Sequence, residues 1–122
     1  MFAWLRRKKD TKPLPTSVTI EGERVRVFAE GVEIESFVWD QVELVAAWKQ
    51  DCWGMDRIWV GFDCTDAEEL VCVHEEMEGY QALIDQMQSR CTGHLADWWS
   101  KVAFPAFVKN LTVVWRRAKS ET

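Results

Sequence analysis

Residues 17–39 read SVTIEGERVRVFAEGVEIESFVW, and this stretch indicates the fold. Apolar and polar residues alternate along it, which is the period-two pattern of β-strands. Gly22 and Gly31 interrupt the alternation and are typical of turns. The pattern therefore predicts three strands joined by hairpins, over Ser17–Glu21, Arg24–Phe28 and Val32–Trp39.

The third predicted strand separates two kinds of side chain. Its aliphatic residues fall on one face, whereas Phe37 and Trp39 fall on the other. Trp59, on a later predicted strand, also projects away from that strand's aliphatic face. Either the sheet curls and covers these aromatic rings, or they remain partly exposed as a site for a partner.

Strand patterns continue downstream, and the period then changes to that of helices. Three further strands are predicted over Glu43–Lys49, Arg57–Asp63 and Leu70–His74, with a loop at 51–56. A helical spacing of i, i+3, i+4, i+7 and i+11 follows at Tyr80, Leu83, Ile84, Met87 and Cys91. A second helix is predicted from the spacing of Leu95, Trp98, Trp99 and Val102. Pro105 ends this helix, Leu111–Arg117 forms a last strand, and Trp98 and Trp99 are both expected to pack onto the sheet.

The predicted fold class is α+β, with a mostly antiparallel meander sheet of about six strands, two helices and a C-terminal strand. The chain of 122 residues is 48% hydrophobic, which suits one core and excludes a disordered chain. A basic N-terminal lead-in at 1–15, a single domain at 16–118 and a tail at 119–122 are expected. The longest apolar runs are far shorter than the roughly 20 residues of a transmembrane helix.

Charge is distributed unevenly along the chain. The net charge of −5 conceals 18 acidic and five basic residues within residues 13–100, flanked by two basic ends. A body this acidic repels phosphate groups, so a nucleic-acid partner is not expected. It would attract a basic protein surface, although the same carboxylates also favour solubility without any partner.

The meander predicts that several acidic residues gather at one end of the sheet. Successive hairpins alternate between the ends, so the turn at Glu30, the loop 51–56 and the exit at 75–78 share one end. The predicted partner site there consists of Glu30, Asp51, Trp53, Met55, Asp56, Glu75, Glu76 and Glu78, with Trp39 and Trp59 as further aromatic anchors. Carboxylates around an apolar anchor fit a basic protein surface. The alternative interpretation is a solvated acidic rim.

Residues for catalysis or metal binding are few. Two Cys and two His are the ligand types that zinc accepts, and they occur here as Cys72, His74, Cys91 and His94. Their spacing matches no standard zinc pattern, and buried thiols with surface histidines are the alternative. The sequence also contains no nucleophile elbow, phosphate loop or dinucleotide fingerprint. We therefore expect a non-enzymatic protein without a cofactor, with reduced cysteines.

Four short segments resemble a family of small, poorly characterised bacterial proteins: FVWDQVELV at 37–45, DRIWV at 56–60, VCV at 71–73 and VVWRR at 113–117. In general character the chain is similar to immunity proteins of bacterial toxin systems, which are small, acidic, cytoplasmic α+β domains. The resemblance implies a stoichiometric inhibitor that binds a toxin domain and blocks its active site.

A membrane-surface role is a second hypothesis. Residues 2–9 combine Phe2, Trp4 and Leu5 with the basic run Arg6–Lys9, which could contact an anionic bilayer. A signal peptide has its basic residues first and a longer apolar stretch after them, so export is not expected. A frayed or loosely docked N-terminus is the other interpretation of this segment.

Overall fold

The computed structural model describes residues 13–52, 55–104 and 109–118, with the backbone alone at Asp51, Cys52 and Met55. Residues 1–12 of the predicted lead-in, Trp53, Pro105 and the predicted tail lie outside the described residues. Within the described ranges the predicted α+β class is confirmed. Each predicted strand and both predicted helices are present, with small shifts of their bounds.

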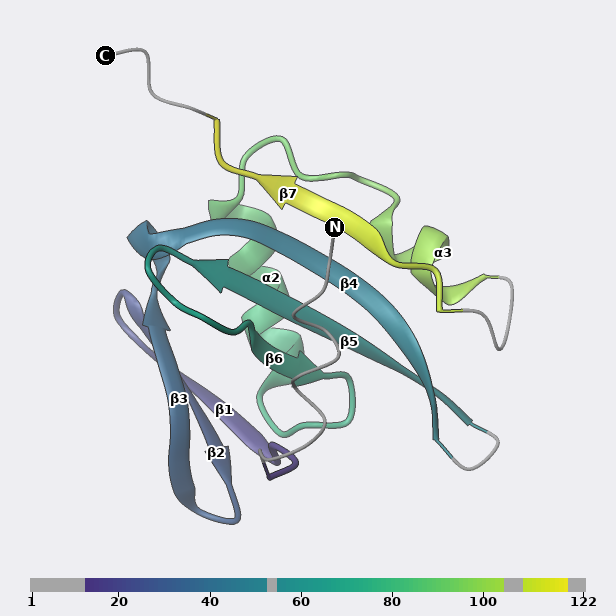
Figure 1. Ribbon diagram of the computed structural model, residues 1–122. Helices are drawn as coiled ribbons and strands as arrows, with labels where there is room; N and C mark the ends of the chain where they lie inside the picture. The colour runs from purple at the N-terminus through teal and green to yellow at the C-terminus, as the bar shows by residue number, and fades with distance from the viewer. Residues whose placement is uncertain (1–12, 53–54, 105–108, 119–122) are drawn as a thin grey trace.

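The strands form two antiparallel sheets (Figure 1). A three-stranded sheet has the order β1-β2-β3, formed by β1 (Ser17–Glu21), β2 (Arg24–Ala29) and β3 (Val32–Val38). A four-stranded sheet has the order β6-β5-β4-β7, formed by β4 (Val42–Cys52), β5 (Met55–Cys64), β6 (Val71–His74) and β7 (Thr112–Arg116). The helices are α2 (Tyr80–Arg90) and α3 (Trp98–Ala103).

The single six-stranded meander is wrong, because the chain changes sheets after β3. A short 3₁₀ helix at Trp39–Gln41 turns the chain, and β4 then pairs with β5 and β7 instead of β3. The turn carries the indole of Trp39 into the core, 5.4 Å from the ring of Phe37 and 5.9 Å from that of Phe62. Burying these rings between the two sheets requires a corner, which a flat continuation of β3 could not provide.

The same contacts decide between the two alternatives for the aromatic face of β3, because the rings are covered. Phe37 and Trp39 are buried, whereas Val32 is 65% exposed. The predicted loop at 51–56 is also mostly strand, since β4 and β5 form a long hairpin that includes both of its ends. Alternation identified the strands correctly, but it did not show which face meets the core.

The main core lies between the two sheets and α2. It combines Val25 and Val27 of the smaller sheet with Val60 and Phe62 of the larger one. The predicted apolar face of α2 is confirmed, because all five of its residues are buried. In the view of Figure 1, α2 and α3 lie behind the four-stranded sheet. Among the described residues, no helix has both the length and the apolar character needed to cross a bilayer.

The two sheets are joined where β1 meets the segment before α2. The amide of Val18 donates to the carbonyl of Glu78 at 2.9 Å, and the amide of Glu78 donates to the carbonyl of Thr16 at 3.2 Å. Gly79 follows with φ of 89°, and a Cβ there would collide with the carbonyl oxygen of Val18. Glycine at this position therefore allows the helix to begin directly against β1.

Replacing Gly79 with alanine tests this close approach. Gly79→Ala and Gly22→Ala both place a side chain at positive φ, which costs about 1–2 kcal/mol. Only Gly79 also has a backbone oxygen in the way, since nothing lies within 4 Å of a Cβ at Gly22. Gly79→Ala should lower the free energy of unfolding by about 1–3 kcal/mol more than Gly22→Ala in urea denaturation. Equal losses in the two variants would contradict the proposed packing constraint.

Candidate interaction site

We call the end of the sheet that carries the predicted partner site the acidic end. The structure brings part of this site together. Thr16 joins two of its members, since its Oγ1 accepts from the amide of Glu30 at 3.0 Å and its carbonyl accepts from the amide of Glu78. Both glutamates are exposed. Asp51 pairs with Asp56 in the register of the β4–β5 hairpin, and Met55 pairs with Cys52.

Three carboxylates of this end have roles inside the fold. Arg57 Nη2 lies 2.8 Å from Glu76 Oε1, and Glu75 Oε2 accepts from the amide of Ile58 at 3.0 Å. Asp56 lies 3.1 Å from the ammonium of Lys49, whose side chain is only 2% exposed. These contacts depend on strand pairing between distant residues, so sequence spacing alone did not reveal them.

The two tryptophans proposed as anchors differ in their surroundings. Trp39 is buried, and the guanidinium of Arg90 lies 5.6 Å from the centre of its ring. Trp59 lies on the face of the four-stranded sheet opposite the helices, 4.8 Å from the ring of His74. Trp39 is therefore shielded from a partner, whereas Trp59 is half-buried and packs on the residue before Glu75.

An open groove lies beside the acidic end, next to the helices. Its volume is about 550 Å³, and its lining includes Glu75, Tyr80, Ile84, Gln88, Trp98 and Trp99. Gln88 Oε1 accepts from the indole nitrogen of Trp98 at 3.1 Å, and this bond fixes two of the lining side chains relative to each other. Burial, and to a lesser extent the charge of Glu75, raises the pKa of Tyr80, so its hydroxyl stays protonated at neutral pH.

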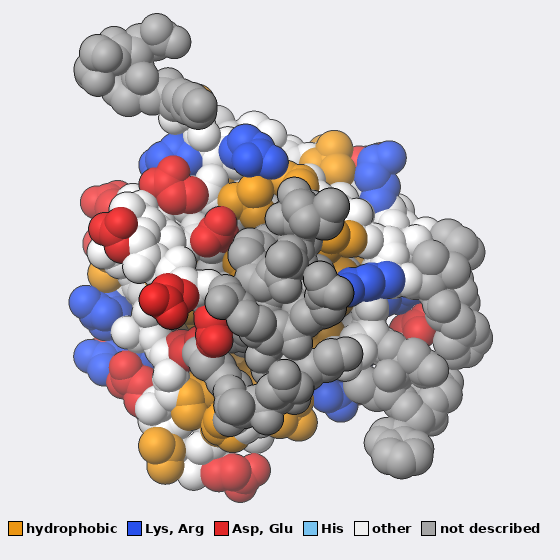
Figure 2. All heavy atoms as spheres, viewed as in Figure 1, with side chains coloured by type: hydrophobic (Ala, Val, Ile, Leu, Met, Phe, Trp, Pro, Cys, Tyr) orange, Lys and Arg blue, Asp and Glu red, His pale blue; other side chains and the backbone are white. Residues whose placement is uncertain are grey.

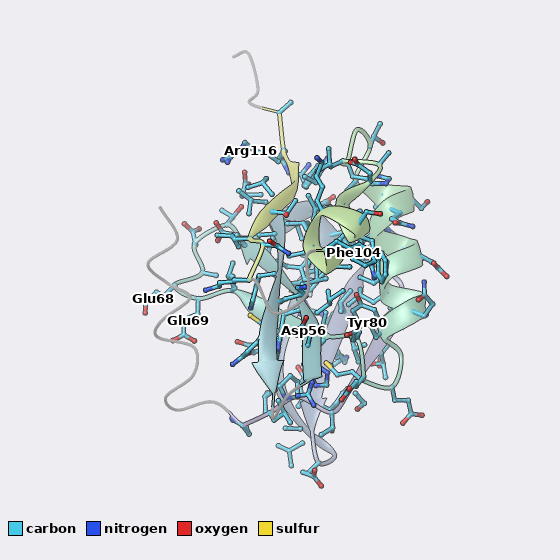
Figure 3. The ribbon with its side chains drawn as sticks, turned by 90° about the vertical axis from the view of Figure 1, so that its right-hand side faces the viewer. Asp56, Glu68, Glu69, Tyr80, Phe104 and Arg116 are labelled. Atoms are coloured by element: carbon cyan, nitrogen blue, oxygen red, sulfur yellow. The ribbon has the colours of Figure 1, made fainter. Side chains whose placement is uncertain are left out.

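Two exposed aromatic residues form a rim next to this groove. Trp99 is 49% exposed and Phe104 is 65% exposed, and their rings meet edge to face at 6.1 Å. Lys49 donates to the carbonyl of Ala103 at 2.7 Å, which ties the residue before Phe104 to β4. Figure 3 views the molecule from this side, with Asp56, Tyr80 and Phe104 labelled. We call Trp99 and Phe104 the aromatic rim.

The sequence analysis missed the aromatic rim. Trp98 is buried as predicted, but the expectation that Trp99 also packs onto the sheet is corrected by its exposure. Consecutive helical residues point about 100° apart, so one of two adjacent tryptophans can face the core while the other lies at the exposed edge of the helix, as Trp99 does. Phe104 precedes Pro105, which favours an extended backbone and places Phe104 beyond the end of the helix.

The four residues of the zinc hypothesis are not brought together. Nε2 of His74 hydrogen-bonds the carbonyl of Pro15 at 2.9 Å, and its Nδ1 accepts from the amide of Glu76 at 3.2 Å. Cys72 belongs to the cluster on the outer side of the four-stranded sheet, whereas Cys91 belongs to the main core. Across the described ranges, no three His, Cys, Asp or Glu side chains are grouped to hold a metal ion.

Two buried thiols, those of Cys64 and Cys91, remain protonated at neutral pH. Burial raises the pKa of Cys64 to about 12 and that of Cys91 to about 11. The nearby carboxylates of Asp63, Glu35 and Glu43 raise the pKa of Cys64 further. A thiol nucleophile requires a lowered pKa, so neither environment is that of an activated cysteine.

Comparisons with known proteins give no family assignment, because no family model, curated protein or solved structure matches this chain.

The buried ring of His74 makes stability depend on pH. Burial, with the nearby guanidinium of Arg57, lowers the pKa of His74, while the Pro15 carbonyl and Glu76 oppose this shift. A base with a lower pKa in the folded state stabilises the fold above its unfolded pKa of about 6.5, and this contribution is lost as pH falls below that value. Between pH 7.5 and 5.5, the urea midpoint should therefore fall more steeply in the wild type than in His74→Gln.

The matched control for this measurement is His94→Gln, which removes a partly buried histidine bonded to the Cys91 carbonyl. It should keep the wild-type slope over the same pH range. A slope in His74→Gln as steep as in the wild type would show that another group carries the pH dependence.

Proposed function

We propose that this protein is a stoichiometric binding protein of the immunity type, which neutralises a bacterial toxin domain by covering a basic surface of it. The observation that carries the proposal is the aromatic rim, two large rings exposed beside an open groove bordered by a carboxylate. The proposal keeps the partner chemistry expected from the acidic sequence. It moves the aromatic anchor from Trp39 and Trp59 to Trp99 and Phe104.

The exposure of the aromatic rim supports a binding role. Aromatic side chains dominate the energy of protein interfaces, especially where they insert beside a depression that excludes water. Here the depression is apolar at Ile84 and Trp98 and polar at Gln88, which matches the mixed character of interface centres. A partner segment bound in the groove would remove both rim rings from water at once.

Charge around the groove favours a basic partner. Glu75 lines the groove. Glu76, the next residue, is paired with Arg57, and Glu78 is exposed two residues later. Because Glu76 is already paired at 2.8 Å, its main effect is on the long-range field and less on direct bonding. Glu75 and Glu78 are therefore the residues expected to meet arginine or lysine of the partner.

The membrane hypothesis depends on residues 2–9, which lie outside the described residues, and it stays a prediction. The zinc hypothesis has no support from the placement of its four residues.

A toxin-neutralising function is tested with the product of the neighbouring gene, by growth rescue and by calorimetric titration at a defined salt concentration.

Truncating the aromatic rim should abolish tight binding. The double variant Trp99→Ala/Phe104→Ala should weaken the affinity for the partner at least about 30-fold, because interface anchors typically contribute 2 kcal/mol or more. Val32→Ala is the matched control, since Val32 is equally exposed at 65% but lies on the other sheet. Comparable affinities of the two variants would place the partner away from the groove.

Neutralising the groove carboxylates should slow association. Glu75→Gln keeps an oxygen that can accept from the amide of Ile58, and Glu78→Gln keeps the length of an exposed side chain, so the expected effect of the double variant is on charge. The association rate at low salt should fall several-fold and become less sensitive to salt, with a smaller change in dissociation rate. Asp40→Asn, on an exposed residue of the 3₁₀ turn, is the control. Unchanged association in the double variant would exclude steering by this end.

A further inference from the structure

The ring of His74 is hydrogen-bonded to the backbone on two sides. Its Nδ1 accepts from the amide of Glu76 at 3.2 Å, and its Nε2 lies 2.9 Å from the carbonyl oxygen of Pro15. A carbonyl oxygen only accepts and an amide N–H only donates, so the neutral ring carries its proton on Nε2. The backbone therefore fixes one tautomer of this histidine.

A second proton on the ring is incompatible with this arrangement. Protonation of Nδ1 converts an acceptor into a donor, and two donors would then face each other across 3.2 Å. His74 is only 4% exposed, so the new N–H would have little access to water where the ring now lies. A buried donor without an acceptor is unfavourable, and the turn at Glu76 therefore has to move before the ring can keep a second proton.

Two charged side chains act on the ring from the elements around it, Arg57 of β5 and Glu76 of the turn, and they are joined to each other at 2.8 Å. The other neighbours are uncharged, namely the ring of Trp59 at 4.8 Å and the carbonyl of Pro15. Burial and, to a lesser extent, Arg57 lower the pKa of His74 from its usual 6.5, although Pro15 and Glu76 act in the opposite direction. The ring is therefore neutral at neutral pH and gains its second proton in mildly acidic solution.

The turn between β6 and α2 also carries side chains of the groove. Glu75 lines the groove, and its Oε2 accepts from the amide of Ile58 at 3.0 Å. Met77 lines the groove as well, and its sulfur accepts from the amide of His74 at 3.2 Å. Glu76, whose amide bonds to the histidine ring, lies between these two residues in the chain. A movement of the turn would therefore displace both groove residues.

We propose that protonation of His74 is a switch for the groove: a proton from solvent breaks the bond to the Glu76 amide, loosens the turn and displaces Glu75 and Met77. The inference rests on the proposed function, because it takes the groove as the site of the basic partner. Binding is intact at neutral pH and weakens in mildly acidic solution. Histidine protonation acts on binding in this way wherever it biases an element that has two arrangements.

The effect on binding comes from local geometry and not from overall charge. Protonation of one histidine changes the net charge of −5 by a single unit. The acidic side chains that Figure 2 shows toward the left of the visible face remain ionised in mildly acidic solution. Long-range attraction of a basic partner therefore persists, and the loss of affinity is expected in the dissociation rate.

An NMR titration of the free wild-type protein between about pH 7.5 and pH 4.5 tests the switch without any substitution. At the upper end, long-range ¹H–¹⁵N spectra should show His74 protonated on Nε2 alone. As the pH falls, the amide resonance of Glu76 should shift with the midpoint of the His74 ring. Hydrogen-exchange protection of the Glu76 and Ile58 amides should fall at least about fivefold. His94, the other histidine of the chain, is the internal control, and its midpoint should appear in neither amide.

Arg57→Gln should move the switch while leaving the histidine in place. Removing the guanidinium takes away a charge that opposes the second proton, so the midpoint of His74 should rise. The Glu76 amide should follow the ring to the new midpoint. Arg24→Gln, at an exposed arginine bonded to Ser36 on the other sheet, is the matched control and should leave the midpoint unchanged. A Glu76 amide that does not follow the ring in either protein would overturn the proposal.

Calorimetric titration with the product of the neighbouring gene separates the switch from the proposed function. Between pH 7.5 and a pH below the His74 midpoint, the Kd should rise at least about fivefold more in the wild type than in His74→Gln. If His74→Gln does not fold, Arg57→Gln replaces it, and its loss of affinity should begin at the higher midpoint. Equal rises in wild type and His74→Gln would overturn the switch and leave the proposed function standing. Coupled titration of ring and Glu76 amide without binding at either pH would reject the proposed function and support the switch.

Discussion

The indole of Trp39 lies at the corner between the two sheets, and most of the tertiary structure is organised around it. Its ring packs edge-on against both Phe37 and Phe62, which are themselves stacked at 4.8 Å. These three rings connect the end of one sheet to the centre of the other. Contacts among these rings therefore fix how the two sheets lie against each other.

Charged groups reinforce this corner from two directions. Arg90, at the end of α2, covers the ring of Trp39 and forms two hydrogen bonds to the carboxylate of Glu23, at 2.6 and 2.7 Å. The paired guanidinium lowers the pKa of Glu23, so the contact persists into mildly acidic solution. Arg117, following β7, donates to the carbonyls of Trp39 and Val42. Helix and last strand are thus both tied to the turn between the sheets.

Local patterns were sufficient to predict the elements, and long-range pairing was not. The bounds of β1 and the buried face of α2 follow from residue spacing, because alternation and the 3.6-residue period reflect local geometry. The separation into two sheets depends on how Trp39 packs, which no strand reveals by itself. The acidic end was recognised in part, but the inward turn of Asp56 depends on Lys49, seven residues away across a hairpin.

The groove and the apolar cluster of Trp48, Leu70 and Cys72 lie on opposite sides of the four-stranded sheet. Figure 3 shows this separation, with Phe104 and Tyr80 on the helical side and Glu68 and Glu69 on the other. A partner in the groove would contact the helices and the rim.

The buried position of Lys49 determines where reagents that react with lysine can modify this protein. It is the one lysine within residues 13–100, and its ammonium is enclosed between Asp56 and the end of α3. All other lysines belong to the two basic ends of the sequence. Acylating reagents, amine-coupled supports and enzymes that modify lysine would therefore act at the ends of the chain, and the acidic body would keep its full negative charge.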